Sequence, residues 1–306
     1  MLVSICVTTY KRPQGLQRLL QGLAQLRFEK IARPDIEVII IDNHNQGEAA
    51  KVCQEMQADF PWILKTDVEL QQGVTYGRNK SISLANPQTD AIAILDDDEV
   101  PVSNWLDELL WVQQEYQADV VTGTVLPHFM EKEPADWVMK SGFFNPPRSQ
   151  TGESREVAFT NNVLVKAEIL RQYNPVFDNR FALTGGEDTY LFMQIYQAGY
   201  KIVWADDAIV YDWLPADRTK PKWILERCRH LWSTRSLSEK ELYPSWATKA
   251  IRALKGLALI LIGIVGLPFS LFWGRQGIFK SLMYIYKGTG TYLGLMGINR
   301  QEYKGV

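Results

Sequence analysis

The amino-acid sequence predicts an α/β fold in which helices flank a mainly parallel, mixed sheet. Apolar runs of strand length alternate with stretches of helical periodicity over residues 2–205. Two of these runs, in residues 36–43 and 91–99, end in acidic residues, which is typical of strands that reach the binding edge of such a sheet. A C-terminal region then follows with long apolar segments and a basic balance. Functional groups are therefore expected at the strand ends of one large α/β domain, with a helical appendage behind it.

The first part of the chain contains two predicted strands, each followed by a helix. Residues 2–10, LVSICVTTY, form the first strand, and an amphipathic helix begins after Pro13 with leucines at helical spacing. Residues 36–43, IEVIIIDN, form a second buried strand, and a polar helix is expected near residues 46–59. This alternation indicates parallel pairing of the strands.

The centre of the chain repeats the pattern around an acidic run. A loop leads into a helix over residues 73–85, and the run AIAIL, residues 91–95, has the branching of a strand buried on both faces. Further elements are expected as a helix at 105–116, a strand at 119–127, strand then helix within 157–170, and turn, helix and strand within 181–205. Residues 127–157 are rich in Pro, Gly, Ser and aromatic residues, a composition typical of a long irregular loop and of substrate lids.

The C-terminal region has the character of a membrane-associated segment. Residues 256–273, GLALILIGIVGLPFSLFW, are marginally long enough to span a bilayer, with basic residues on both sides. A re-entrant or interfacial hairpin is an equal alternative, since residues 278–293 contain apolar residues at helical spacing. A buried helix pair of a C-terminal domain is the third possibility. The sequence thus predicts a catalytic domain at 1–235 and a membrane-associated tail at 236–306.

Charge is distributed unequally between these regions. Residues 1–215 carry 18 Lys and Arg against 30 Asp and Glu, whereas residues 216–306 carry 15 against 5. Because long apolar runs interrupt the basic residues, the tail suits an anionic membrane surface better than nucleic acid. The N-terminus is apolar first and basic afterwards, the reverse of a signal peptide, so the body of the protein is expected in the cytosol, at the inner face of the membrane.

The acidic run Asp96-Asp97-Asp98-Glu99 follows the strand at 91–95 directly. In extended chain Asp96 and Asp98 point the same way and can share one hard divalent cation. Carboxylate ligands favour Mg²⁺ or Mn²⁺ over Zn²⁺, and such a cation commonly neutralises phosphates. A solvated acidic loop is the alternative interpretation.

A second candidate element is GGED, residues 185–188. Two glycines precede Glu187 and Asp188 at a predicted helix start, where an acid can cap exposed N–H groups. Capping explains one acid but not the glycine pair with two acids. A carboxylate held close to a substrate by a tight glycine turn can instead act as a general base.

Six motifs in order give the chain a resemblance to inverting nucleotide-sugar glycosyltransferases of family 2, which have the GT-A fold. They are VTTYKR, IIIDN, GVTYGRN, LDDDEVP, TNN and GGED, and the resemblance covers roughly residues 1–235. It implies transfer of a sugar from a nucleotide-sugar donor, with uridine the favoured base, to a glycan or lipid-linked acceptor. The membrane tail favours assembly of surface polysaccharide or lipopolysaccharide.

The resemblance also implies roles for individual residues. Asp188 resembles the catalytic base, with Glu187 beside it, and Asp96–Asp98 resembles the DxD motif with Asp98 as a metal ligand. The residues expected to contact the nucleotide sugar are Thr8, Tyr10, Asp42, Arg78, Asn79, Asp96, Asp97, Asn162 and Gly186.

One position departs from the family pattern. Where related enzymes often carry a His after the last core strand, this chain has Asp212, in VYDW. Because Asp also binds Mg²⁺ or Mn²⁺, Asp212 is a further predicted ligand beside Asp96 and Asp98.

Two other classes of protein remain as alternatives. A nucleotidyltransferase can share the α/β sheet and the carboxylate metal site, but it gives no reason for GGED. A non-enzymatic membrane scaffold with a degenerate transferase domain would need no acids at these positions. The first strand–helix turn has neither GxGxxG nor a P-loop, which argues against dehydrogenases and P-loop enzymes.

Overall fold

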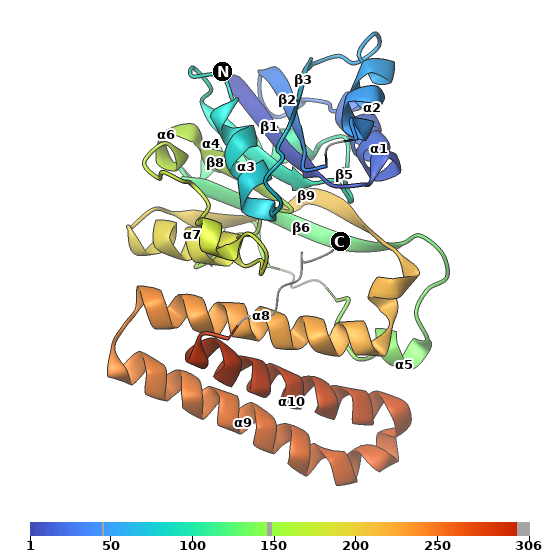
Figure 1. Ribbon diagram of the computed structural model, residues 1–306, viewed down its shortest axis with the longest axis vertical. Helices are drawn as coiled ribbons and strands as arrows, with labels where there is room; N and C mark the ends of the chain where they lie inside the picture. Colours follow the sequence, from blue (N-terminus) through green and yellow to red (C-terminus); the bar gives the residue numbers. More distant parts are fainter. Residues whose placement is uncertain (45, 146–148, 299–306) are drawn as a thin grey trace. The chain divides into compact units, whose positions relative to one another are not determined.

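A computed structural model describes residues 1–44, 46–145 and 149–298. They form two compact units: residues 1–126 with 149–213, and residues 127–145 with 214–298. We call them the sheet unit and the helical unit and describe each by itself (Figure 1).

Nine strands within the described residues form one sheet, in the order β3-β2-β1-β4-β8-β6-β9-β5, with β7 beside β9. The strands are β1 Leu2–Thr9, β2 Asp35–Asp42, β3 Ile63–Val68, β4 Ala91–Asp96, β5 Glu99–Pro101, β6 Val120–Phe129, β7 Ser154–Arg155, β8 Val163–Lys166 and β9 Ile202–Leu214. The pairs β1–β2, β1–β4 and β2–β3 are parallel, whereas β4–β8, β6–β8 and β5–β9 are antiparallel. The predicted α/β class with a mixed sheet is confirmed, but β3, β5 and β7 were not predicted from the sequence.

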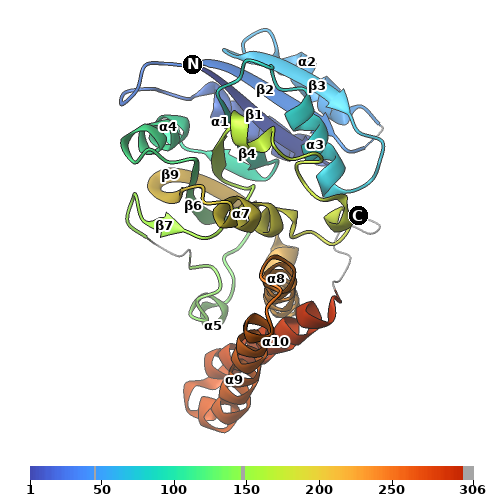
Figure 2. The ribbon, with the colours of Figure 1, turned by 90° about the vertical axis from the view of Figure 1, so that its left-hand side faces the viewer.

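Helices cover both faces of the sheet (Figure 2). The helices of the sheet unit are α1 Pro13–Ala24, α2 Glu48–Met56, α3 Val74–Ser83, α4 Trp105–Glu115, α6 Ala167–Leu170 and α7 Glu187–Gln197, with a 3₁₀ turn at Asn179–Phe181. Alternate strand residues explain the two layers: Val3 and Ile5 pack with α1 and α4, while Cys6 packs with α6 and α7. A strand with both faces covered is mostly apolar, as β1, β2 and β4 are, and the buried Ser4 of β1 donates a hydrogen bond to the buried Glu37 of β2.

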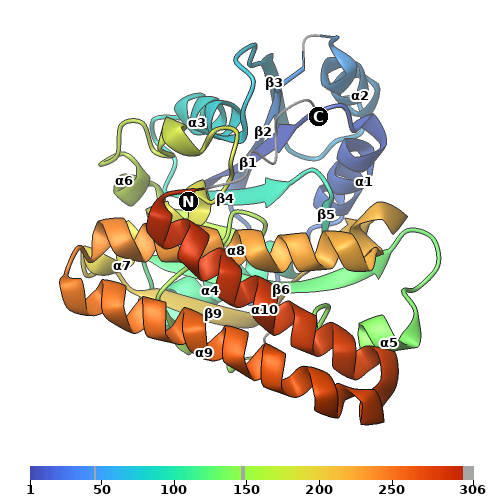
Figure 3. The same ribbon diagram turned by 60° about the horizontal axis from the view of Figure 1, so that its bottom comes forward.

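The helical unit consists of α5 Asp136–Met139, α8 Pro221–Leu242, α9 Trp246–Ser270 and α10 Gly274–Met296, with 3₁₀ turns at Ala216–Thr219 and Leu271–Trp273. Helix α10 lies between α8 and α9 (Figure 3). Glycines permit the close approach: a Cβ on Gly288 would lie 2.6 Å from the Gly256 carbonyl oxygen of α9, and one on Gly290 would lie 2.1 Å from the Arg229 carbonyl oxygen of α8.

This seam differs from the apolar stripe expected on residues 278–293. Small residues of α10 make up much of its buried face, among them Ser281, Gly288, Gly290, Thr291 and Gly294. Ile278, Leu282 and Leu293 are only partly buried. Helices packed through small residues approach more closely than helices packed through leucines, and this packing is common between membrane helices.

Helix α9 meets the length and composition required of a membrane span, and within the described residues it alone does so. It has 25 residues, and its most apolar window has mean hydropathy 2.1 with 17% of the window buried. The interpretation as a buried helix pair is therefore wrong for α9, because most of its apolar side chains are exposed.

The two units do not meet at the predicted domain boundary between residues 235 and 236. That boundary falls inside α8, which continues to Leu242. Residues 127–145, expected to be part of a lid-like loop, belong to the helical unit, where Phe144 and Val138 share a buried cluster with Leu214, Ile224 and Phe279. The aromatic residues that suggested a loop over substrate are largely used for packing this unit.

Candidate active site

The carboxyl ends of three parallel strands meet at one edge of the sheet unit. Thr8 of β1 lies in register with Asp96 of β4, and Thr9 of β1 lies in register with Asp42 of β2. The strand order β3-β2-β1-β4 in the sheet makes this edge the usual ligand-binding crevice of an open α/β sheet. The predicted residues at these strand ends are therefore brought together.

The acidic run is a turn rather than an extended strand. β4 ends at Asp96, residues 97–98 form a turn, and β5 begins at Glu99. The extended geometry assumed for Asp96 and Asp98 is therefore wrong. The turn is tightly packed, since a Cβ on Gly15 of α1 would lie 2.8 Å from the Asp97 carbonyl oxygen.

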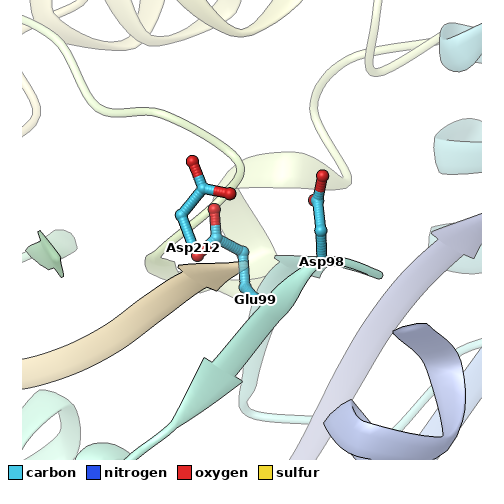
Figure 4. A group of neighbouring side chains, drawn as sticks. All are labelled: Asp98, Glu99 and Asp212. Carbon is cyan, nitrogen blue, oxygen red and sulfur yellow. The ribbon is translucent and has the colours of Figure 1, made fainter. Parts of the chain in front are cut away.

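Three acids group at this turn, and they are not the predicted set. Carboxylate oxygens of Asp98, Glu99 and Asp212 lie within 4.8 Å of one another. Figure 4 shows their side chains pointing to the same side, from the turn and from the facing strands β5 and β9. Glu99 stands directly opposite Asp212 in the antiparallel register, which explains why residues 113 positions apart in the chain meet. Asp98 and Asp212 were predicted as ligands, Glu99 was not, and Asp96 lies outside the group.

The chemistry of this group fits a hard divalent cation. Glu99 is 2% exposed, and its Oε2 atom has no hydrogen-bond partner among the described residues. Burial, together with the charges of Asp212 and Asp98, raises the pKa of Glu99 well above its ordinary value. A buried carboxylate oxygen without a donor, close to two further carboxylates, is what a Mg²⁺ or Mn²⁺ ion would satisfy.

The Asp97 carboxylate accepts hydrogen bonds from two side chains of the sheet unit. Thr9 Oγ1 donates to its Oδ2 at 2.7 Å, and Arg12 Nη1 donates to its Oδ1 at 2.8 Å. Arg12 also contacts Asp98 Oδ2 at 2.8 Å. Burial raises the pKa of Asp97 to about 6, against the opposing charge of Arg12. Arg12 was not predicted as a site residue; its position directly after the first strand was the available signal.

Arg78 joins the acidic run to the GGED element. It is 6% exposed, and its Nη2 atom lies 2.5 Å from Asp96 Oδ1 while Nη1 donates to Glu187 Oε1. Burial raises the pKa of Glu187 to about 7, although Arg78 opposes this. Arg78 thus forms a buried ionic link to Glu187, 109 residues further along the chain, and its predicted contact with the nucleotide stays a prediction.

The predicted helix start at GGED is confirmed. Gly185 and Gly186 have φ of 72° and 91°, a left-handed conformation that favours glycine, and α7 begins at Glu187. Asp188 is half-buried, and its Oδ1 accepts the Thr189 N–H at 2.5 Å. The glycine pair thus holds both acids in the first turn of α7, where the helix dipole stabilises negative charge.

The remaining predicted residues lie in different surroundings. Thr8 Oγ1 is buried without a hydrogen-bond partner in the described part of the chain. The Tyr10 ring packs edge-on against the His44 ring, with 5.4 Å between the ring centroids. Asp42 accepts the backbone N–H groups of His44 and Ala49 at 2.9 and 3.3 Å, so it shapes the loop after β2.

Asn79 and Asn162 use their amides for structure. Asn79 exchanges two hydrogen bonds of 2.8 Å with the Phe177 backbone. Asn162 is fully buried; its Oδ1 accepts from the Trp105 indole at 2.8 Å, and its Nδ2 donates to Thr124 and Ala208 carbonyls. The predicted contact of each residue with the nucleotide sugar stays a prediction.

A mixed α/β sheet with acids gathered at the carboxyl ends of its strands is the arrangement expected of the GT-A fold. The family model for glycosyl transferase family 2 matches residues 4–173. The chain belongs to this family.

The curated relatives include polysaccharide and lipid-linked sugar enzymes. The chain is 30% identical over 227 residues to the succinoglycan biosynthesis protein ExoM of Rhizobium meliloti, covering 74% of this chain and 71% of that protein. It is 23% identical to a glucosyl-dolichyl phosphate glucuronosyltransferase of Haloferax volcanii, covering 86% and 85% of the two chains.

Solved structures share the fold. The mannosyltransferase PcManGT of Pyrobaculum calidifontis, in complex with GDP-Man and Mn²⁺, aligns with a TM-score of 0.63 at 16% identity, covering 96% of this chain and 87% of that one. S. aureus TarS in complex with UDP aligns with a TM-score of 0.53 at 15% identity, covering 95% and 91%. The predicted GT-A fold is confirmed, and the family assignment separates the chain from nucleotidyltransferases.

Proposed function

We propose that the protein is a metal-dependent, inverting glycosyltransferase that moves a hexose from a nucleotide-sugar donor, with uridine the favoured base, to a hydroxyl of a lipid-linked glycan. The observation that carries the proposal is the group formed by Asp98, Glu99 and Asp212 at the strand edge that also holds Thr8 and Asp42. Neighbours of the same fold were solved with UDP and with GDP-Man and Mn²⁺, which supports a diphosphate ligand at this edge.

Asp98, Glu99 and Asp212 would hold Mg²⁺ or Mn²⁺ through carboxylate oxygens. When bound, such a cation supplies positive charge that stabilises a departing nucleoside diphosphate. Thr8, Tyr10 and Asp42 line the adjacent strand ends and form the proposed nucleoside site. The unpartnered Thr8 hydroxyl supports this role, because a buried hydroxyl normally has a hydrogen-bond partner.

Asp188 is the proposed general base. Its carboxylate takes the proton from the acceptor hydroxyl while that oxygen attacks the anomeric carbon and the bond to the diphosphate oxygen breaks. One displacement inverts the anomeric centre, and the diphosphate leaves with the bonding electrons. Gly186 sets the position of Asp188, and Arg78 positions Glu187 and Asp96.

The helical unit supports a lipid-linked acceptor. A groove of about 440 Å³ is lined by Ile285, Tyr286, Tyr292 and Leu293 of α10 together with Arg229 of α8. Its mostly apolar walls match the chemistry of a lipid chain, while the Arg229 guanidinium is paired with Glu226. With α9 apolar and exposed, we place the protein at the cytosolic face of the inner membrane, in surface polysaccharide assembly.

Calorimetric titration of the full chain in detergent with UDP, GDP and dTDP, with and without Mn²⁺, tests the nucleotide site. One nucleotide should bind only with Mn²⁺. Asp98→Asn should abolish this Mn²⁺-dependent binding, whereas Asp59→Asn, which changes an exposed acid of the sheet unit, should leave it unchanged. Absence of binding by the folded protein would favour the scaffold alternative.

The transfer step is tested with a lipid-linked sugar acceptor and the donor found by titration. NMR of the product should show an anomeric configuration opposite to that of the donor, and Asp188→Asn should lose at least about a hundredfold in kcat, the contribution of a general base. A product that retains the donor configuration would contradict the mechanism.

A further inference from the structure

Helix α9 exposes apolar side chains along its whole length. Besides Trp246 at its first position, those that are more than 40% exposed are Ile251, Leu254, Leu257, Leu261, Ile262, Ile264, Val265 and Phe269, and we call these eight the α9 surface. Exposed apolar side chains that follow a whole helix mark an interaction site.

We propose that this surface lies within one leaflet of an anionic bilayer, with α9 parallel to the membrane plane and both of its ends on the cytosolic side. The inference rests on the membrane location in the proposed function and deepens it. By length and hydropathy alone α9 could instead cross the bilayer.

The pairing of α9 with α10 argues against a crossing. Glycine seams run along both helices in antiparallel order: Gly256 meets Thr291, Gly263 meets Ile285, and Gly277 meets Ser270. Helix α10 thus packs against α9 over nearly all of the length of α9. A crossing α9 would carry α10 into the hydrocarbon with it.

Helix α8 and its charges are tied to the same pair. A Cβ on Gly294 of α10 would lie 2.1 Å from the Ser233 carbonyl oxygen of α8, so these backbones are in close contact. Within α8 and α10 the charged residues are Lys222, Glu226, Arg227, Arg229, Arg235, Glu239, Lys240, Glu241, Arg275, Lys280 and Lys287. Charges at bilayer depth are strongly unfavourable, so the three helices cannot cross together.

The ends of α9 indicate the same side of the membrane. Trp246 is 83% exposed just where α9 starts and Trp273 is 70% exposed just after it, as expected of aromatic residues at the headgroup level. Basic residues follow each tryptophan, at 249 and 255 and at 275 and 280, and residues 243–298 contain no Asp or Glu. Positive charge at both ends favours one cytosolic, anionic surface over two opposite surfaces.

Depth measurements on the full chain test the proposal. A fluorescent label is attached to Leu261→Cys at the middle of α9, or to Trp246→Cys or Phe272→Cys at its ends, and quenched by lipids with nitroxides at shallow or deep positions. The native cysteines are buried and provide the background control. In vesicles of phosphatidylglycerol and phosphatidylcholine, the shallow nitroxide should quench Leu261→Cys best, and an impermeant thiol reagent outside should reach both ends.

Two outcomes would overturn the proposal. Best quenching of Leu261→Cys by the deep nitroxide, with only one end reached by the outside reagent, would show a crossing helix. No quenching, together with disulfide cross-linking of Leu261→Cys between two chains, would show that a second copy covers the surface.

Charge dependence and a matched pair of variants complete the test. The affinity for vesicles should fall at least tenfold when the anionic lipid is omitted. In vesicles with anionic lipid, the double variant Leu261→Glu/Val265→Glu should also bind at least tenfold more weakly, whereas the double variant Leu261→Ala/Val265→Ala should lose much less affinity. Unchanged binding in the Glu variant would contradict the proposal. Nucleotide titration in detergent should be the same in all variants, so a failure here is distinguishable from a failure of the proposed function.

Discussion

The four acids after Leu95 have four different environments. Asp96 pairs with the buried Arg78, Asp97 is held by Thr9 and Arg12, Asp98 faces the strand edge, and Glu99 is buried against Asp212. A sequence of like residues thus provides both structural ion pairs and candidate ligands.

Glu99→Gln should weaken Mn²⁺ binding by at least about tenfold, the scale at which even outer-shell partners of a metal act. Because the pKa of Glu99 is raised in the metal-free protein, the ion must displace a proton, so Mn²⁺ affinity of the native chain should rise with pH. Electron paramagnetic resonance of free Mn²⁺ measures the Mn²⁺ affinity of each protein and its change with pH. Glu55→Gln, on an exposed part of α2, serves as control, and equal affinities for both variants would remove Glu99 from the ligand set.

Glu37→Gln should lower the stability of the sheet unit. Glu37 is 2% exposed and accepts from Ser4 at 2.5 Å, Lys65 at 2.6 Å and the Asn86 N–H at 2.7 Å. Burial alone would raise the pKa of Glu37, but these hydrogen bonds, that from Asn86 foremost, hold it below its ordinary value of 4.5. We expect a loss of about 2 kcal/mol at pH 7, the scale of a hydrogen bond to a charged group.

The pH dependence of that loss follows from the lowered pKa. The native carboxylate contributes fully above about pH 4.5, and its contribution disappears as the pH falls through the lower folded-state pKa. Urea unfolding of both chains in detergent, from pH 7 to pH 3.5, measures the difference. A difference that grows on acidification would contradict the assignment.

At the scale of elements, the two ends of α7 offer a matched comparison. Gly186 before the helix and Gly199 after it both have φ of 91°. Only Gly186 borders the acids Glu187 and Asp188, and a Cβ on Gly199 would meet no atom within 4 Å.

Gly186→Ala and Gly199→Ala should each cost about 1–2 kcal/mol of stability, because alanine is strained in the left-handed conformation. Only Gly186→Ala should lower kcat, by at least tenfold, through displacement of Asp188 from the acceptor hydroxyl. Thermal unfolding and steady-state transfer rates measure the two effects. Equal kcat losses in both variants would show a general defect of α7 and no role of the GGED turn.

At the scale of the whole molecule, the helical unit includes residues from two distant parts of the chain. Phe129 and Phe144 pack with residues of α8 and α10, so this unit is not a simple C-terminal extension. Its integrity depends on both segments.

A chain that ends at residue 235 should therefore aggregate. It lacks Phe279 and Met283, which are 3% and 6% exposed, and so uncovers Leu214, Ile224 and the aromatic residues around them. Size-exclusion chromatography and binding of a hydrophobic dye compare it with the full chain in detergent. A monomeric, dye-free protein of residues 1–235 would support the sequence-based boundary instead.

The sequence by itself determined the class of fold, most element positions and the family. Buried strands are mostly apolar and helices need capping or glycine turns, so β1, β2, β4 and the start of α7 can be recognised from local pattern. The acidic run and the motif resemblance both indicate Asp98 as a ligand, whereas Asp212 is indicated by its place after the last core strand, where related enzymes often carry a His.

Only the tertiary structure decided how the acids are used. The pairing of Glu99 with Asp212 depends on antiparallel register between β5 and β9, and the link from Arg78 to Asp96 and Glu187 spans elements far apart in the chain. The inclusion of residues 127–145 in the helical unit likewise depends on long-range aromatic packing. Contacts of this kind arise from the arrangement of whole elements, which local sequence patterns do not encode.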